Sequence, residues 1–328
     1  MRVDLVTHGG PGIGYGHLMR MAAMAEGLRD CGVFPRFVLP NRQGTEYLDR
    51  HEFEWEAVGE KRWCVPTGTA PDLYIIDHYA VNSEYFRPFM ERAQVLYVDD
   101  LCLEPYQVSA VLNGHFYWNT LPYPEYFPSA VRLLGPQYCL LRKVYREAVL
   151  EDRHPGTGIL ITTGGTDPSG YMPRLVKEVL SGIGIRDIAV HVIVGAGFVE
   201  STEVEVLASQ DDRVVLHHQP EHLAAIMSQC QLAVSAAGTT LYELAAFGIP
   251  ALSWAMVDNQ RYVYKSASEN GLIVPFDPEQ SGNLNSRLGE WIGDEKRIAE
   301  LGCRLKTLVD GLGAQRAAEA AVQILKMR

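Results

Sequence analysis

The chain has 328 residues, 47% of them hydrophobic and 21% charged, and a net charge of −11. This composition is ordinary for a globular protein, and the length favours two domains over one. The negative charge argues against nucleic acid or an anionic membrane surface as a main partner, because both require a basic face. We find neither a signal peptide nor a hydrophobic run near the roughly 20 residues of a membrane span, so we expect a cytoplasmic protein without integral membrane association.

The cysteines are dispersed along the chain, and none of them forms a C-x-x-C pair. Neither a zinc site nor a disulfide framework is therefore indicated, and buried free thiols in a reducing compartment are the expected state. The six positions are Cys31, Cys64, Cys102, Cys139, Cys230 and Cys303.

In the first half, short hydrophobic runs alternate with helical patterns. "RVDLVTH" predicts a strand, and a glycine-rich stretch then leads into a helix over about residues 17–30. Further strands are predicted at "FPRFVLP", "LYIIDHY", "QVLYVDD" and "SAVLNG". Hydrophobic runs separated by helices are typical of βαβ units and a mostly parallel sheet.

The pattern restarts after "EDRHPGTG" (151–158), a polar, proline-containing segment that we interpret as a domain linker. The second cycle runs through "GILITTGGTDPSG", "IAVHVIVGAGF", "RVVLHH" and "CQLAVSAAGTTLYELAAFGIPALSWAMVDNQ". We predict two Rossmann-like α/β domains, 1–150 and 151–328, with parallel sheets facing a central cleft that holds the substrate. The alanine-rich helix at about 313–328 is expected to pack back toward the N-terminal domain.

The glycine-rich stretch between the first strand and the first helix contains Gly14 and Gly16 and ends at His17. It fails the G-x-G-x-x-G fingerprint, and no P-loop lysine follows, so a nicotinamide enzyme or a P-loop ATPase is disfavoured. The spacing is compatible with an ordinary histidine in the first turn of a helix. The density of glycines favours instead a tight loop that carries His17 into a site.

Three segments of the second half have the character of phosphate or sugar sites. In "TTGGTDPSG", Gly164 and Gly165 allow backbone amides to face an anion before a helix, although a structural turn explains the segment equally well. "DNQRY" adds Asn259 and Gln260 after a strand.

The third segment, "SAAGTTLYE", combines a turn, hydroxyl groups and a carboxylate. Gly238 allows close approach to a ligand, and Thr239 and Thr240 can bind phosphate. Glu243 falls about one helical turn later, where it could accept two ribose hydroxyl groups. A capping box would explain the same Thr–Glu spacing without a ligand.

The set "GYGHLMR", "IIDHY", "VDD", "LLGPQYCLLR", "TTGGTDP", "AAGTTLYELAAFGIP" and "DNQ" resembles the UDP-sugar hydrolases of pseudaminic acid biosynthesis. These belong to the GT-B superfamily, together with the peptidoglycan N-acetylglucosaminyltransferase and spore-coat polysaccharide proteins. The resemblance runs from Val3 to about Gly271. It implies cleavage of UDP-2,4-diacetamido-2,4,6-trideoxy-β-L-altropyranose to UDP and free sugar, for nonulosonic acid synthesis.

Position by position, the resemblance makes His17 the catalytic histidine and Tyr79 the active-site tyrosine. It assigns the binding of nucleotide diphosphate, ribose and sugar to Gly238, Thr239, Glu243, Asn259 and Gln260. The chain departs from the family in two places. Its glycine loop, "HGGPGIGYGH", is longer than the usual I-G-x-G-H through the addition of His8 and Pro11, and Asp258 stands where glutamate commonly precedes Asn-Gln.

The expected reaction is a single inverting displacement at the anomeric carbon without cofactor or metal, because no Asp-x-Asp motif accompanies the glycine loops. His17 would act as the base for water, with His8 and His78 as rivals, and Tyr79 would position the water or the sugar. Two alternatives stay open at this point. One is a glycosyltransferase or epimerase that uses another UDP-sugar, and the other is a non-catalytic nucleotide-sugar-binding protein.

Overall fold

The structure, a computed structural model, describes residues 1–10, 15–59, 69–79, 81–150, 156–182, 187–198 and 201–326. Contacts group the chain into two compact units. The first consists of Met1–Lys143 and Gly311–Arg328, and the second of Val144–Asp310. Most of the predicted linker (151–155) lies outside the described residues, so the predicted boundary at 150 and 151 stays a prediction.

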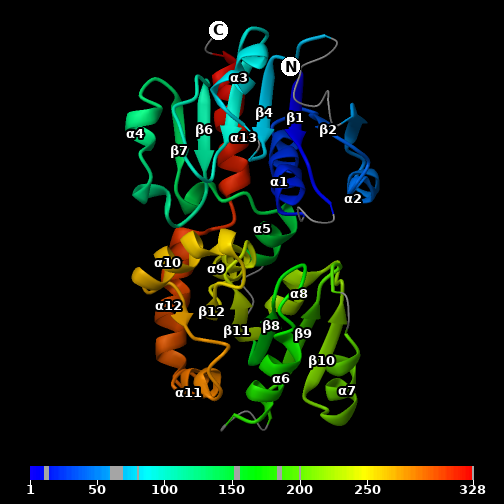
Figure 1. Ribbon diagram of the computed structural model, residues 1–328, viewed down its shortest axis with the longest axis vertical. Coiled ribbons are helices and arrows are strands. Elements are labelled where there is room, and N and C mark those ends of the chain that lie inside the picture. The colour runs from blue at the N-terminus through cyan, green and yellow to red at the C-terminus, as the bar shows by residue number, and fades with distance from the viewer. Residues whose placement is uncertain are drawn as a thin grey trace. The chain divides into compact units, whose positions relative to one another are not determined.

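The first unit is built on a parallel sheet, whose described strands have the order β3-β2-β1-β4-β5-β6-β7 (Figure 1). The strands are β1 (Val3–Thr7), β2 (Arg36–Leu39), β3 (Glu54–Ala57), β4 (Leu73–Asp77), β5 (Gln94–Val98), β6 (Ala110–Asn113) and β7 (Val131–Leu134). The α-helices are α1 (Gly16–Asp30), α2 (Thr45–Arg50), α3 (Ser83–Met90), α4 (Tyr123–Tyr126) and α13 (Gly313–Lys326). All the strand pairs are parallel.

Both faces of this sheet are covered, which is why β1 and β4 are buried along their whole length. On one face, the hydrophobic residues of α1 and α13 pack against alternate residues of β1, β4 and β5. On the other face, α3 and α4 contribute aromatic residues to a second core cluster. The helix predicted at 17–30 therefore has the buried hydrophobic stripe that its sequence indicated.

The last helix, α13, packs against α1 within the first unit (Figure 1). The contact is close enough to require glycine on α1. A Cβ atom at Gly27 would lie 2.7 Å from the backbone oxygen of Ala314. Small residues on both helices, Gly27 and Ala318 among them, let the two backbones approach.

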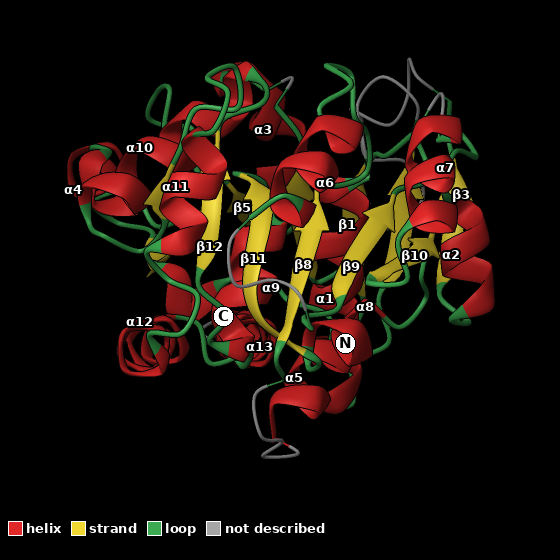
Figure 2. Ribbon diagram, turned by 90° about the horizontal axis from the view of Figure 1, so that it is seen from below, coloured by secondary structure: helices red, strands yellow, loops and turns green. Residues whose placement is uncertain are grey.

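The second unit repeats the α/β plan, with a parallel sheet of described order β10-β9-β8-β11-β12-β13. The strands are β8 (Gly158–Thr162), β9 (Val190–Val194), β10 (Val214–His218), β11 (Cys230–Ala236), β12 (Ala251–Trp254) and β13 (Val274–Pro275). The α-helices are α5 (Lys143–Leu150), α6 (Met172–Leu180), α7 (Thr202–Gln210), α8 (Leu223–Met227), α9 (Thr240–Phe247), α10 (Arg261–Glu269), α11 (Asn283–Gly289) and α12 (Glu295–Leu308). Helices α6, α7 and α11 lie on one face, and α8 and α9 on the other (Figure 2).

Each sheet has one point at which the order of its strands reverses. In the first unit this point lies between β1 and β4, and in the second between β8 and β11. Loops that follow two such strands lead to opposite faces of the sheet and leave a crevice at its carboxyl edge, where open α/β sheets bind ligands. The prediction of two Rossmann-like parallel-sheet domains is confirmed.

Candidate functional site

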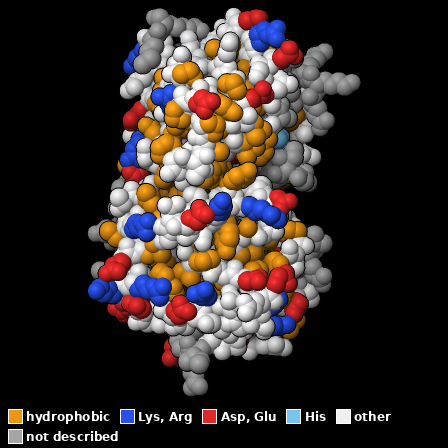
Figure 3. Space-filling view, turned by 60° about the vertical axis from the view of Figure 1, so that its left-hand side comes forward, with side chains coloured by type: hydrophobic (Ala, Val, Ile, Leu, Met, Phe, Trp, Pro, Cys, Tyr) orange, Lys and Arg blue, Asp and Glu red, His pale blue; other side chains and the backbone are white. Residues whose placement is uncertain are grey.

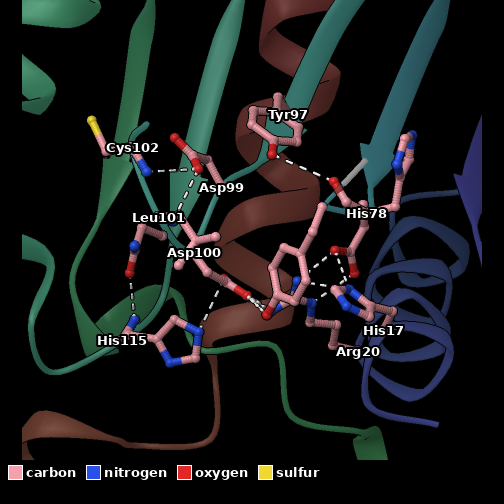
Figure 4. A network of polar contacts seen from close by, with 12 residues as sticks. His17, Arg20, His78, Tyr97, Asp99, Asp100, Leu101, Cys102 and His115 are labelled. Carbon is pink, nitrogen blue, oxygen red and sulfur yellow. Dashed lines mark hydrogen bonds and ion pairs between the residues drawn. The ribbon is translucent and has the colours of Figure 1, made fainter. Parts of the chain in front are cut away.

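At the carboxyl edge of the first sheet, a histidine from α1 meets an aspartate from β4. Helix α1 begins at Gly16, which places His17 in its first turn, and Asp77 is the last residue of β4. The Nδ1 atom of His17 lies 2.7 Å from Oδ1 of Asp77 (Figure 4). Gly16 itself is exposed and has open space around its Cβ position, whereas Gly14 lies outside the described residues.

The Asp77 carboxylate determines which nitrogen of His17 carries the proton. Asp77 is fully buried, and an ionised carboxylate only accepts hydrogen bonds, so Nδ1 of His17 donates. The Nη2 atom of Arg20, 3.0 Å from the same nitrogen, therefore cannot donate to it. In this tautomer Nε2 of His17 keeps its lone pair, and no described residue donates a hydrogen bond to it. His17 is thus oriented as a proton acceptor.

Arg20 joins this pair to a second buried carboxylate. Its Nε atom donates to Oδ2 of Asp77 at 2.6 Å, and its Nη1 atom donates to Oδ2 of Asp100 at 2.8 Å. Burial alone would favour the neutral acids. The Arg20 charge and the hydrogen bonds to its neighbours outweigh burial, and they hold the pKa of Asp77 below its ordinary value and that of Asp100 well below it.

Asp100 also binds two groups from other loops. Tyr79 donates its hydroxyl proton to Oδ2 of Asp100 at 2.7 Å, and Nε2 of His115 lies 3.0 Å from Oδ1. The ring of Tyr79 stands edge-on to that of His17, with centroids 4.6 Å apart. The predicted pair, His17 and Tyr79, is therefore brought together by the fold.

The rival histidines have different surroundings. The His78 ring packs against Tyr85, with centroids 4.7 Å apart, and it points away from the His17–Asp77 pair (Figure 4). Burial lowers the pKa of His78 to about 3 and also lowers the pKa of His8, so both rings are held neutral. His8 is closer to the pair, since its ring centroid lies 5.0 Å from that of His17.

Sequence reasoning missed four members of this cluster as functional residues: Asp77, Arg20, Asp100 and His115. A signal was present for three of them. Asp77 ends the strand within "LYIIDHY", two residues before Tyr79. Arg20 follows His17 by three residues, a spacing that places both on one helix face. Asp100 ends "VDD", which follows a strand next to β4 in the sheet. Nothing in the sequence indicated His115, because its loop reaches Asp100 only through the fold.

In the second unit, the loop after β8 carries Gly164 and Gly165. Gly164 has a φ of 91°, and its amide donates to Oγ1 of Thr162 at 3.0 Å. Beyond the two glycines, Asp167 accepts hydrogen bonds from the first backbone amides of α6, at 3.0 Å from Tyr171 and 2.8 Å from Met172. Part of the helix N-terminus that we expected to face an anion is therefore satisfied by the chain itself.

The loops after the neighbouring strands β11 and β12 lie side by side. A Cβ atom at Gly238 would lie 3.6 Å from Nε2 of Gln260. The Oε1 atom of Gln260 accepts a hydrogen bond from the amide of Met256 at 2.9 Å, which holds the side chain in place. Asn259 is exposed beside it. The predicted residues of these two loops therefore share one part of the carboxyl edge.

Thr240 and Glu243 have the three-residue spacing of a capping box, but Thr240 is the first residue of α9 and not its N-cap, so the box is not formed. Thr239 is the N-cap of α9, but its backbone is already helical and its side chain makes no capping hydrogen bond. Its side chain is exposed, and Thr240 is half-buried at the start of the helix. Glu243 lies in the first turn of α9. The hydroxyl groups are thus left to other partners.

Within the described residues, no three His, Cys, Asp or Glu side chains gather as a metal ion would require. None of the described helices is long and hydrophobic enough to cross a membrane. On the face shown in Figure 3, acidic and basic side chains are interspersed.

Comparison with known proteins finds relatives that are 23% to 30% identical in sequence. No family model matches it. It is 23% identical to the spore coat polysaccharide biosynthesis protein SpsG of Bacillus subtilis over 319 residues, which cover 92% of this chain and 88% of SpsG. It is 30% identical over 159 residues to the N-acetylglucosamine transferase of Halorhodospira halophila that acts on N-acetylmuramyl-(pentapeptide) pyrophosphoryl-undecaprenol. That match covers 46% of this chain and 44% of the transferase.

A further relative is an uncharacterized protein of Methanocaldococcus jannaschii, 23% identical over 80% of this chain, which spans only 57% of that protein. Among solved structures, MurG of Acinetobacter baumannii matches with a TM-score of 0.66 at 12% identity, over 98% of this chain and 99% of MurG. The UDP-GlcNAc 2-epimerase of Neisseria meningitidis matches with a TM-score of 0.65 at 14% identity, over the full length of both chains. The chain has the GT-B fold.

Proposed function

We propose that this protein is a nucleotide-sugar enzyme that hydrolyses a UDP-linked diacetamido-trideoxy sugar and releases UDP and the free sugar for nonulosonic acid synthesis. One observation carries the proposal. His17 is held by Asp77 in the tautomer whose Nε2 accepts a proton, beside the phenol of Tyr79. The resemblance of the motifs to the pseudaminic acid hydrolases and the GT-B fold support the choice of substrate class.

In the proposed reaction, a water oxygen attacks the anomeric carbon while His17 takes one of its protons. The bond between that carbon and the diphosphate oxygen breaks, its electron pair leaves with UDP, and the configuration inverts. The developing imidazolium is stabilised by Asp77, which a general base of this kind requires. Backbone amides near Gly165 and Gly238, together with Gln260, are the groups we assign to the departing diphosphate, and Glu243 to the ribose.

The second candidate function is glycosyl transfer or epimerisation on the same scaffold. It is favoured by the 30% identity with the Halorhodospira transferase and by the structural match to a UDP-GlcNAc 2-epimerase. The two candidates differ in what accepts the sugar. A hydrolase releases UDP from its substrate without an added acceptor, whereas a transferase needs one.

The test is incubation with UDP-2,4-diacetamido-2,4,6-trideoxy-β-L-altropyranose and other UDP-sugars in EDTA, followed by NMR. We expect UDP release without an acceptor, with inverted free sugar as the first product. His17→Phe should lower turnover by about 10²–10⁴-fold, the usual contribution of a general base, and leave UDP binding by calorimetry unchanged.

His51→Phe is the matched control, because His51 lies in the same unit beside Arg29, near the other end of α1. It should retain wild-type turnover. Substituting His8 and His78 singly separates the rivals. Retention of more than about a tenth of the rate in His17→Phe would refute the assigned base. Loss of activity in EDTA that magnesium or manganese restores would refute the metal-independent reaction.

A further inference from the structure

The hydrogen bonds of Asp100 are saturated by donors from three different segments. Oδ1 accepts from Nη1 of Arg20 and from Nε2 of His115, each at 3.0 Å. Oδ2 accepts from the same Nη1 at 2.8 Å and from the Tyr79 hydroxyl at 2.7 Å. His115 is also stacked on Tyr117, with the ring planes 8° apart, which orients its imidazole toward Asp100.

This arrangement determines the polarity of the Tyr79 hydroxyl. A phenol has one proton to donate, and Asp100, an ionised carboxylate beside Arg20, can only accept it. What Tyr79 offers to a ligand is therefore a lone pair on its oxygen. Tyr79 is 44% exposed, so this oxygen belongs to a side chain that a ligand can reach.

His17 has the same polarity for the same reason. Asp77 takes the proton of Nδ1, and Nε2 is left as an acceptor. The rings of His17 and Tyr79 are neighbours. The two side chains that we place beside the anomeric carbon thus both present acceptors, and each is polarised by its own buried aspartate.

We propose that Asp100 is a positioning residue that makes Tyr79 a hydrogen-bond acceptor, so that Tyr79 and His17 together select water over a carrier hydroxyl group as the nucleophile. The inference rests on the proposed function and deepens it. Water has two O–H groups. One gives its proton to Nε2 of His17, and the other donates to the Tyr79 oxygen and remains on the product as the anomeric hydroxyl.

An alcohol has a single O–H group and leaves one of the two acceptors unpaired. An unpaired polar group disfavours binding by roughly tenfold or more. The proposal therefore connects the choice between hydrolysis and transfer to a residue that does not touch the substrate. Asp100 acts through Tyr79, and its effect is separable from a general loss of structure.

The first experiment measures how the sugar partitions between water and methanol. With UDP-2,4-diacetamido-2,4,6-trideoxy-β-L-altropyranose in aqueous methanol, wild type should give almost only free sugar. In Asp100→Asn the amide oxygen should face Arg20 and the amide N–H₂ should donate to Tyr79, which turns the phenol proton outward. Hydrolysis should fall about tenfold or more with little change in KM, and the ratio of methyl glycoside to free sugar should rise.

Tyr79→Phe removes the acceptor altogether and should raise the same ratio. Adding Asp100→Asn to Tyr79→Phe should then change the ratio no further, because both act through one oxygen. Tyr126→Phe, on α4, is the matched control and should leave the ratio at its wild-type value. A fall in rate with an unchanged ratio in both single variants would overturn the proposal.

The second experiment needs no substrate. The Tyr79 titration can be followed through the tyrosine ¹³Cζ signals, assigned with Tyr79→Phe. Burial and the Asp100 carboxylate raise the pKa of Tyr79, so Asp100→Asn should lower it. An unchanged titration would overturn the role of Asp100 even if the protein hydrolyses the sugar nucleotide. If no UDP-sugar is turned over, the proposed function fails, and this titration still decides whether Asp100 controls Tyr79. Should Asp100→Asn not fold, the ratio in Tyr79→Phe decides the selection of water.

Discussion

The carboxyl edges of the two sheets are built in opposite ways. In the first unit the edge holds buried charged side chains that bind one another, with Asp77 fully buried and Arg20 shared between two aspartates. In the second unit the corresponding loops are rich in glycine, and their polar side chains, such as those of Thr239 and Asn259, are exposed.

The difference indicates a division of labour between side chains and backbone. Charged groups that are already paired before a ligand arrives keep their geometry and protonation states, which suits proton transfer. Exposed hydroxyl groups and glycine amides hold no charge of their own, and they suit the binding of an anion that brings its charge with it. The charged side chains of the first edge therefore bind one another, whereas Thr239 and Asn259 of the second edge are exposed.

Removing Arg20 should have the largest effect on stability. Arg20→Met leaves Asp77 and Asp100 buried without their cation, and breaking a buried pair typically destabilises a protein by about 3–5 kcal/mol. The matched variant in the second unit is Arg261→Met. It breaks the exposed Arg261–Asp258 pair and should leave the urea midpoint unchanged.

Native-state hydrogen exchange shows where stability is lost. It compares the exchange rates of the amides in β1 and β4 with those of the amides in β11 and β12. We expect faster exchange in the first unit alone. If Arg20→Met and Arg261→Met lowered the stability of the protein equally, the buried charges would not be what stabilises the carboxyl edge of the first sheet.

Asp99 should make the first unit sensitive to pH. Its Oδ1 atom accepts from the amides of Leu101 and Cys102, and its buried Oδ2 has no hydrogen-bond partner among the described residues. Burial raises its pKa from 3.8 to about 6. Because the folded protein binds this proton more tightly, the stability it contributes is fully present below pH 3.8 and is lost as the pH rises through about 6.

The full difference in the pKa of Asp99 between the folded and unfolded states corresponds to about 3 kcal/mol in the free energy of unfolding. Urea unfolding at pH 4 and pH 7 should show that the free energy of unfolding of Asp99→Asn rises relative to that of wild type as the pH increases. In the second unit the sign reverses at Asp211, whose pKa the hydrogen bond from Arg213 lowers to about 2. The stability that this lowered pKa contributes is present above pH 3.8 and is lost as the pH falls through about 2, so the free energy of unfolding of wild type should rise relative to that of Asp211→Asn between about pH 2 and pH 4. If the free energy of unfolding relative to wild type changed with pH in the same direction for both variants, the predicted contrast between the two units would be wrong.

Glu243 tests the second edge and should show the smallest effect. If its carboxylate accepts the ribose hydroxyl groups, Glu243→Ala should weaken UDP binding by about 1–3 kcal/mol in calorimetry, because those hydroxyl groups lose their partner. Glu269→Ala, an exposed glutamate at the end of α10, is the control and should bind UDP as wild type does. An unchanged affinity in Glu243→Ala would exclude the ribose role.

Much of the fold was predictable because its strands are buried on both faces. β1, β4, β8 and β9 are short hydrophobic runs bounded by polar or glycine residues, a pattern that is typical of a covered parallel sheet. The short strands β3 and β7 were not predicted. β3 is exposed along much of its length, and both lie at the edges of the sheet, where the hydrophobic signal is weak.

The sequence by itself determined the buried strands, the α/β class and the position of His17 at the start of a helix, because each of these depends on local spacing. Only the tertiary structure decided the polar network around His17 and Tyr79. Asp77, Asp100 and His115 lie 60 to 98 residues from His17 along the chain, and strand order brings them to one edge of the sheet. The proton on Nδ1 and the polarity of Tyr79 follow from those contacts, since hydrogen-bond direction depends on which groups the fold places within about 3 Å.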